Sequence, residues 1–252
     1  MRDLGKIGFG VLMFMIVATG SASAAGCGNG SLDGSYGFNV RGVDNASGTP
    51  MATVGLFTAD GSGNITLGQF TQSNDGTLST ATLTGTYSIG SSCTGTLTTT
   101  DSNSVVRHYF VVLSGIKRAA LKIVDTDNGL TLSGDARAQG VGICGFTGKG
   151  SAYAENLSGF VGSVPEAIVG RVGTNGSGTI SFGFNARALG GVVNTNPISG
   201  SYTVNSNCTG TAQIVFGIKS YNFTYVAVDA GKQYILLETD ANTTVAGALT
   251  TE

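Results

Sequence analysis

Apolar and polar residues alternate one by one along several stretches of this chain. The stretches 35–41 (SYGFNVR) and 81–89 (ATLTGTYSI) each place their apolar side chains on one face. The stretch 180–187 (ISFGFNAR) follows the same rule, which would put its phenylalanines in a core and Asn185 and Arg187 in solvent. A period of two with one apolar face is typical of half-buried β-strands. Helical spacing is not sustained after the first 25 residues, so the pattern predicts an all-β protein.

Polar turns, most of them containing glycine, separate these stretches at regular intervals. In the first half they lie at residues 44–48, 60–63, 74–76, 90–92, 101–103, 114–115 and 127–129. Glycine adopts the positive φ that tight hairpin turns require. The turns divide each half into about eight strands of roughly 7–12 residues, and short connections make sequential strands pair as an antiparallel meander. Closure of such a meander removes its edges, so we predict two tandem up-and-down β-barrels, with β-sandwiches as the alternative.

The second half of the chain repeats the first. Residues 54–66 (VGLFTADGSGNIT) align with residues 169–181, and residues 83–96 (LTGTYSIGSSCTGT) align with residues 198–211, both at an offset of 115. A repeat of this length is typical of two copies of one structural unit, each with its own core.

The cysteines follow the same repeat. Cys27 and Cys93 are 66 positions apart, and Cys144 and Cys208 are 64 positions apart. Four cysteines allow three pairings, and the matched spacing favours one disulfide in each half, Cys27–Cys93 and Cys144–Cys208. In the chain-entropy model, closing a loop of this length stabilises the fold by about 4 kcal/mol.

Residues 1–24 have the features of a secretory signal peptide. Arg2 and Lys6 precede an apolar run at residues 7–19, and residues 22–24 (ASA) fit the site that signal peptidase cuts. The run is shorter than the roughly 20 residues that a membrane-spanning helix needs. We therefore predict an exported protein of the periplasm or the extracellular space.

Export also bears on the cysteines and on the domain boundaries. The tract 24–27 (AAGC) resembles a bacterial lipobox, in which Cys27 would carry a lipid in place of a disulfide, but Ala24 stands where a lipobox usually has leucine. The cysteine spacing favours the disulfide, and membrane attachment is expected only if Cys27 is lipidated. We place the first β unit at residues 25–138 and the second at residues 139–252.

Charge gives little support for a polyanionic partner. Charged residues make up 11% of the chain and the formal net charge is −2, so there is no basic field to attract nucleic acid. A small basic group comprises Arg107, Lys117, Arg118 and Lys122. We interpret it as a solvated strand face, because charged tracts act as interaction sites mainly when they are long.

The tract 55–66 (GLFTADGSGNIT), followed by LTGTY at 83–87, resembles Gly/Thr-rich exported repeat units of environmental bacteria. The function of those units is not established, so the resemblance carries no functional residues to this chain. The LTGTY motif and the eight-strand rhythm are also superficially similar to avidin-type and lipocalin-type barrels. Avidin pockets rely on tryptophan, which this chain lacks, so biotin binding is not implied.

Acidic residues at predicted turns are candidates for metal binding. Residues 60–64 (DGSGN) offer alternate oxygen ligands of the kind calcium prefers, although the second copy keeps no carboxylate there. Asp125 and Asp127 recur as Glu238 and Asp240. Carboxylates two positions apart on a strand share a face, about 7 Å from each other, and could chelate calcium or face a sugar. We favour polar turns at both places and predict no metal and no cofactor.

One histidine and two tyrosines are the remaining candidate functional residues. His108 could join a Ser-His-Asp arrangement, but no nucleophile elbow accompanies it and the second copy has its equivalent near Tyr221. We favour a strand residue without a catalytic role. Tyr87 and Tyr202 occupy matched positions on an apolar face, where they could line a ligand cavity; packing in a core is the favoured interpretation.

These observations favour a non-enzymatic module of the cell envelope or extracellular space. Its partner would be a small molecule, a glycan or an envelope component, or its role would be structural. A secreted hydrolase remains an alternative, and it requires two carboxyl groups about 5–10 Å apart in one cleft. An outer-membrane barrel of sixteen strands is another, favoured by the alternation but opposed by local disulfides and by the repeat.

Overall fold

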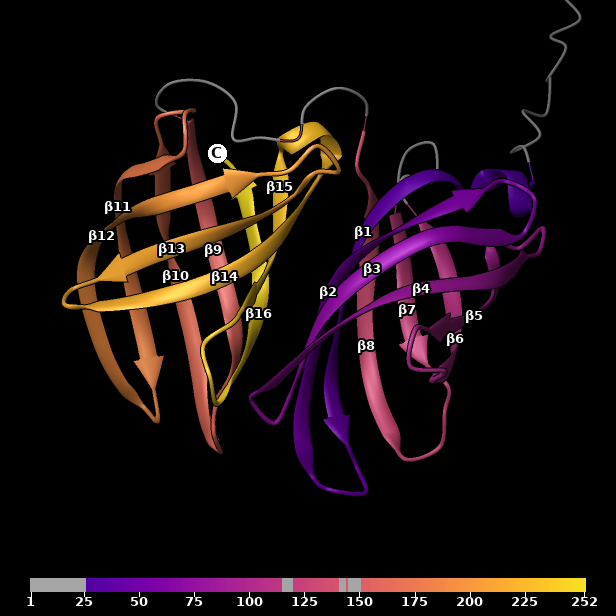
Figure 1. The fold of residues 1–252 in the computed structure, drawn as a ribbon, viewed down its shortest axis with the longest axis horizontal. Coiled ribbons are helices and arrows are strands. Elements are labelled where there is room, and N and C mark those ends of the chain that lie inside the picture. The colour runs from indigo at the N-terminus through magenta and orange to yellow at the C-terminus, as the bar shows by residue number, and fades with distance from the viewer. Residues whose placement is uncertain (1–25, 115–119, 141–143, 145–150) are drawn as a thin grey trace, which may run out of the picture.

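The protein consists of two closed antiparallel β-barrels that lie side by side (Figure 1). A computed structural model describes residues 26–114, 120–140, 144 and 151–252. In each barrel eight strands follow in sequence order and the eighth pairs with the first. The predicted all-β fold of two tandem up-and-down barrels is therefore confirmed, and sheet closure excludes the sandwich and a single sixteen-stranded barrel. The predicted signal peptide at residues 1–24, Lys117 and Arg118 lie outside the described residues.

Barrel 1 begins after a short 3₁₀ turn, and barrel 2 contains another between its sixth and seventh strands. The elements of barrel 1 are η1 (Asn29–Ser31), β1 (Asp33–Asp44), β2 (Thr49–Asp60), β3 (Asn64–Asn74), β4 (Thr77–Ile89), β5 (Thr94–Asp101), β6 (Val106–Ser114), β7 (Ala120–Asp125) and β8 (Leu130–Ala138). Those of barrel 2 are β9 (Ser151–Val161), β10 (Val164–Thr174), β11 (Thr179–Leu189), β12 (Val192–Val204), β13 (Thr209–Phe216), β14 (Lys219–Val228), η3 (Asp229–Gly231), β15 (Gln233–Glu238) and β16 (Thr243–Thr251). No helix among the described residues is long and apolar enough to span a membrane.

The two ends of each barrel differ. The structure contains both expected disulfides, Cys27–Cys93 and Cys144–Cys208, and we call the end that carries them the disulfide end. The opposite end, which we call the far end, carries the β1–β2, β3–β4, β5–β6 and β7–β8 turns of barrel 1 and their equivalents in barrel 2. Because Cys27 is bonded to Cys93, its thiol is not available for a lipid. Disulfides are typical of proteins in oxidising, exported compartments.

Alternation along the strands builds the two cores, as the sequence pattern predicts for most strands. On β1 and β4 the side chains of Tyr36, Phe38, Leu83 and Tyr87 point into barrel 1 and are buried. Tyr153 and its neighbours do the same in barrel 2. Each barrel thus has its own apolar core, enclosed by its own strands.

Strand β11 departs from the predicted pattern. Its pairing with β12 shifts register between Ile180 and Phe184, as that of β3 with β4 does between Ile65 and Gly68. An extra residue at such a bulge reverses which side chains face inward. Phe184 is consequently exposed, whereas Asn185 and Arg187 point into the barrel and are buried. The prediction of an apolar face through the phenylalanines of β11 was wrong for this reason.

A second apolar cluster joins the barrels to each other. It consists of outward-facing residues of β2, β14, β15 and β16: Ala52, Val54, Leu56, Val226, Val228, Ile235, Leu237 and Ala246. Hydrogen bonds surround it, among them Arg41 Nη1 to the Ala246 carbonyl at 2.8 Å and Ser73 Oγ to the Thr243 carbonyl at 2.5 Å. The two barrels therefore share a buried contact rather than being connected by the chain alone.

Candidate functional site

The interior of barrel 1 contains a cavity of about 200 Å³ near the far end. Its apolar lining comes from Phe38, Val40, Phe70, Ala81, Leu83, Val105 and Leu132. Its polar lining comes from Thr53, Gln72, Ser79, Thr99, Asp101, Asn103, Arg107 and Tyr109. Five of these residues, at positions 79, 101, 103, 105 and 107, lie at or beside the β3–β4 and β5–β6 turns, so the cavity is nearest to solvent at the far end. We call this space the barrel-1 cavity.

The barrel-1 cavity becomes apolar with depth. A smaller void of about 30 Å³ shares Phe38, Leu83 and Tyr109 with it and is further lined by Phe57 and Leu97. A molecule in the cavity would therefore contact aromatic and aliphatic groups at its inner end and polar groups near the mouth. This division is typical of sites that bind a small organic molecule.

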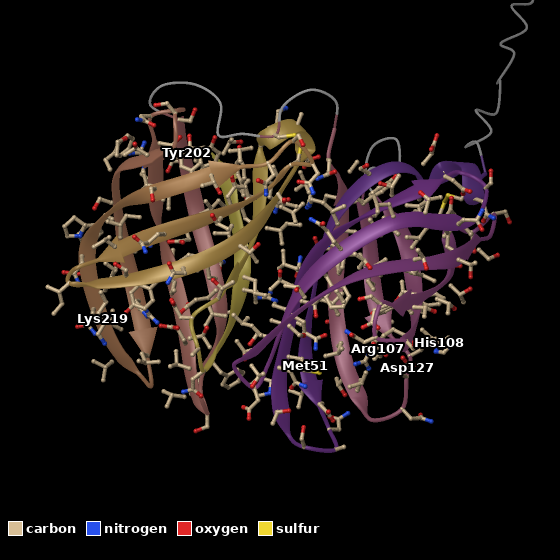
Figure 2. The ribbon with its side chains drawn as sticks, in the orientation of Figure 1. Met51, Arg107, His108, Asp127, Tyr202 and Lys219 are labelled. Atoms are coloured by element: carbon tan, nitrogen blue, oxygen red, sulfur yellow. A yellow bond between two sulfur atoms is a disulfide. The ribbon has the colours of Figure 1, made fainter. Side chains whose placement is uncertain are left out.

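Arg107 is the one cationic residue of the cavity lining. It alternates with Tyr109 on the inward face of β6, and within the described residues it forms no ion pair. The interpretation of Arg107 as part of a solvated basic face was therefore wrong. Figure 2 shows it beside His108 and Asp127 in barrel 1. An inward-facing guanidinium without a carboxylate partner is suited to an anionic group or a hydrogen-bond acceptor on a ligand.

Two titratable groups lie close to Arg107. Burial raises the pKa of Tyr109 to about 12, and the Asp125 carboxylate adds to this shift. Burial also raises the pKa of Asp125, while the positive charge of Arg107 acts in the opposite direction. Tyr109 is therefore a neutral hydroxyl at physiological pH and can donate or accept a hydrogen bond in the cavity.

At the matching level, barrel 2 is filled by polar side chains. In barrel 1, Phe38, Gly55 and Phe70 lie opposite one another on the neighbouring strands β1, β2 and β3. The equivalent positions of barrel 2 are occupied by Glu155, Gly170 and Asn185. The Asn185 amide donates to the Glu155 carboxylate over this glycine. A hydrogen-bonded polar pair thus replaces the two aromatic rings that border the barrel-1 cavity.

Further substitutions extend the polar filling of barrel 2. Arg187, at the position of Gln72, donates to Glu166, and its guanidinium lies 3.8 Å from the centre of the Tyr221 ring. Glu238 occupies the position of Asp125 and is fully buried. Three glutamates and one arginine are therefore enclosed together, and we call Glu155, Glu166, Glu238 and Arg187 the buried carboxylate cluster.

Two glutamates of this cluster, Glu155 and Glu238, are shifted toward their neutral forms. Burial raises the pKa of Glu155 to about 7, although the hydrogen bond from Asn185 opposes the shift. Burial raises the pKa of Glu238 to about 8, and the nearby charge of Arg187 opposes it. Neither carboxylate oxygen of Glu238 has a hydrogen-bond partner among the described residues. Burial without enough compensating positive charge disfavours the ionised carboxylate, so protonation of Glu155 and Glu238 is the expected response.

The acidic tracts highlighted by the sequence act as turns. The backbone N–H groups of Ser62 and Asn64 donate to Asp60, and the Asn64 side chain, which also donates, lowers the pKa of Asp60 to about 2. Asn175 caps the equivalent turn of barrel 2 through the same backbone pattern. No group of three potential metal ligands occurs among the described residues.

Asp125 and Asp127 do not share a face, contrary to the geometry expected for a chelating pair. Asp125 ends β7 and points inward, whereas the chain turns after it and Asp127 reaches the outside of β6. There Asp127 lies 2.7 Å from His108 Nδ1 and also accepts the His108 backbone N–H. Burial tends to raise the pKa of Asp127, but the hydrogen bonds from His108 outweigh it and lower the pKa.

The His108–Asp127 pair has an exact structural counterpart without a histidine. In barrel 2 the backbone and side chain of Asn222 donate to the two oxygens of Asp240, at 2.9 and 2.6 Å. Since an asparagine performs the same bonding, the pair serves to attach the β7–β8 turn to β6. This observation favours the structural interpretation of His108, which lies exposed on the barrel surface.

Tyr87 and Tyr202 are core residues rather than parts of the barrel-1 cavity. The Tyr87 hydroxyl donates to the Leu32 carbonyl at 2.7 Å, which ties β4 to the segment that closes the disulfide end. Tyr202 is buried in the core of barrel 2. In Figure 2 it lies toward the disulfide end, away from Lys219.

Comparison with known proteins adds little to this geometry. No protein-family model matches the chain, and no curated protein matches it. A crystal structure of a candidate AttH from Nitrosomonas europaea is similar, with 10% sequence identity, 87% of this chain and 92% of that chain covered, and a TM-score of 0.30. A likeness at this level carries no argument about activity.

Proposed function

We propose that the protein is an exported, non-enzymatic binding protein whose barrel-1 cavity holds one small amphipathic molecule. The observation that carries this proposal is the cavity itself, with an apolar inner end and an unpaired Arg107 near its mouth. The ligand would have a short hydrocarbon body and an anionic head, because these groups complement the two parts of the lining.

The size of the cavity limits the ligand. Pockets for drug-sized molecules occupy about 300–1,000 Å³, and the barrel-1 cavity is smaller. A medium-chain carboxylate such as octanoate has suitable dimensions and chemistry. Because polar side chains fill the equivalent level of barrel 2, we expect one ligand for each chain despite the repeat.

Two other classes of function, a hydrolase and a purely structural protein, receive less support. A hydrolase with paired carboxylates needs both in one accessible cleft. Asp101 is the one carboxylate among the residues that line the barrel-1 cavity, and the three glutamates of the buried carboxylate cluster are shielded from solvent. A purely structural role would favour filled barrels with exposed strand edges, whereas both sheets are closed and barrel 1 is hollow. The disulfides support the exported setting, which together with the signal-like N-terminus makes the periplasm or extracellular space the proposed location.

Isothermal titration calorimetry with octanoate tests the proposal. We expect saturable binding with a stoichiometry of one, at least about tenfold weaker in Arg107→Gln because the head group loses a charged hydrogen bond. Ala81→Leu should abolish binding by filling the cavity. Arg171→Gln is the matched control, since Arg171 pairs with Glu252 on the exterior of barrel 2. Absence of binding, or unchanged affinity in both cavity variants, would overturn the proposal.

A further inference from the structure

Aliphatic side chains project from three hairpin turns at the far end of barrel 2. Val164 begins β10 after the β9–β10 turn, Val192 and Val193 begin β12, and Ile218 lies within the β13–β14 turn. Ile218 is fully exposed, and Val192 and Val193 are 64% and 63% exposed. Soluble proteins seldom place several aliphatic side chains together in water without a partner for them. We call these four residues the aliphatic tips.

Tight turns hold the aliphatic tips outward and bring two of the three turns together. The β11–β12 connection consists of Gly190 and Gly191, both at positive φ, so the chain reverses within two residues. A side chain at Gly190 would meet Val164 Cγ1 at 3.0 Å, which places the β9–β10 and β11–β12 turns in contact. Val164, Val192 and Val193 therefore lie on two short turns that touch, and Ile218 projects from the separate two-residue β13–β14 turn.

The repeat shows that these tips are not a requirement of the fold. Each of the three corresponding turns of barrel 1 carries an aspartate: Asp44, Asp75 or Asp101. The aliphatic residues beside those turns, Leu78, Val105 and Val106, are 38%, 44% and 46% exposed. The three aliphatic turns of barrel 2 contain no acidic residue, and the charged residue beside them is Lys219. The turns of barrel 2 thus lack the acidic residue that each corresponding turn of barrel 1 carries, and Val192, Val193 and Ile218 are more exposed than the aliphatic residues beside the turns of barrel 1.

We propose that the aliphatic tips insert into a lipid bilayer and dock the protein at a membrane surface. Separate convex turns form no groove for a folded partner, whereas each can enter a fluid acyl layer independently. Both far ends face the same side, because Asn242 of the β15–β16 turn donates to the Gly76 carbonyl of the β3–β4 turn, at 3.1 Å. Docking would therefore turn the mouth of the barrel-1 cavity toward the membrane, although the docking itself does not depend on the proposed ligand.

Vesicle co-sedimentation without added ligand tests this proposal. The mature protein is mixed with vesicles of phosphatidylcholine and phosphatidylglycerol, and the bound fraction is compared among three proteins. Wild type should bind, and binding should persist at about 0.5 M salt because the contact is aliphatic rather than electrostatic. The variant Val192→Ser/Val193→Ser/Ile218→Ser should partition at least about tenfold more weakly, since three aliphatic side chains no longer leave water.

The control variant is Leu67→Ser, which removes a side chain of similar exposure, 62%, from β3 close to the disulfide end. It should bind vesicles as wild type does. Absence of wild-type binding, loss of binding at high salt, or an equal loss in Leu67→Ser would overturn the proposal. Concentration-dependent dimerisation that the tip variant abolishes would also overturn it, because the tips would then contact a second copy. Titration of the tip variant with octanoate should give the wild-type affinity. A failure of membrane docking can thereby be distinguished from a failure of the proposed ligand site.

Discussion

Buried carboxyl groups occupy the same inward position in both barrels, yet their surroundings differ. Asp125 lies near the Arg107 charge and accepts the backbone N–H of Asp127, whereas both oxygens of Glu238 lack hydrogen-bond partners within the described structure. Burial favours the neutral form of each group, and it raises the pKa of Glu238 to about 8. The protonation state of this single residue should therefore influence the stability of barrel 2.

Replacement of Glu238 by glutamine should stabilise the protein at alkaline pH. The pKa of Glu238 is higher in the folded state than the usual 4.5, so its contribution is fully present below about pH 4.5 and is lost as the pH rises through about 8. Glutamine resembles the protonated form and avoids this loss. Thermal unfolding should show a gain of roughly 5 °C or more for Glu238→Gln at pH 9 and little change at pH 5. The exposed Glu252→Gln provides the control, and a destabilised Glu238→Gln at pH 9 would contradict the assignment.

At the scale of strands, the pattern of the sequence was sufficient for some elements and misleading for others. It identified the inward faces of β1 and β4, because apolar residues occupy one face and small or polar residues the other. It failed on β11, since one extra residue at a bulge reverses the inward face and nothing in local alternation marks that position. The same limit hid the buried carboxylate cluster, whose Arg187 had been placed in solvent.

The barrel-1 cavity also could not be predicted from the local alternation of apolar and polar residues. Arg107 shares its face of β6 with Tyr109 and Val111, but the opposite face carries Val106 and Phe110, so neither face is clearly the apolar one. Closure of the sheet decides the matter by turning Arg107 inward. Comparison of the two halves could have given a signal, because Phe38 and Phe70 of the first copy correspond to Glu155 and Asn185 of the second.

A pair of matched substitutions checks the register of β11. Phe184 is 54% exposed on β11, and Phe223 is buried in the core of barrel 2 on β14. Phe223→Ala should lower the free energy of unfolding by about 3–5 kcal/mol, because it removes a buried ring and leaves a cavity. Phe184→Ala should lower it by less than about 1 kcal/mol. Chemical denaturation measures both values, and equal losses would mean that β11 has the register predicted by simple alternation.

At the scale of the whole molecule, the two barrels use the same surface of the repeated unit in different ways. Val54 and Val169 hold equivalent outward positions on the second strand of each barrel. Val54 is buried in the cluster that joins the barrels, whereas Val169 is 58% exposed. Gly37, on the neighbouring β1, leaves room for Val228 to approach to a distance at which a side chain would collide with it. The contact between barrels is thus a specialised feature of one face of each copy.

Introduction of a charge into this contact should uncouple the barrels without unfolding either one. Val54→Asp places an unpaired carboxylate among apolar side chains, which costs about 3 kcal/mol or more, and separation of the barrels returns the charge to water. Each core and each disulfide lies within one barrel, so each unit should remain folded after separation. Urea unfolding should change from one transition to two, and small-angle scattering should show a larger radius of gyration. Val169→Asp introduces the same charge at the equivalent exposed site and should leave both measurements unchanged; a single transition in Val54→Asp would show that the apolar cluster does not couple the barrels.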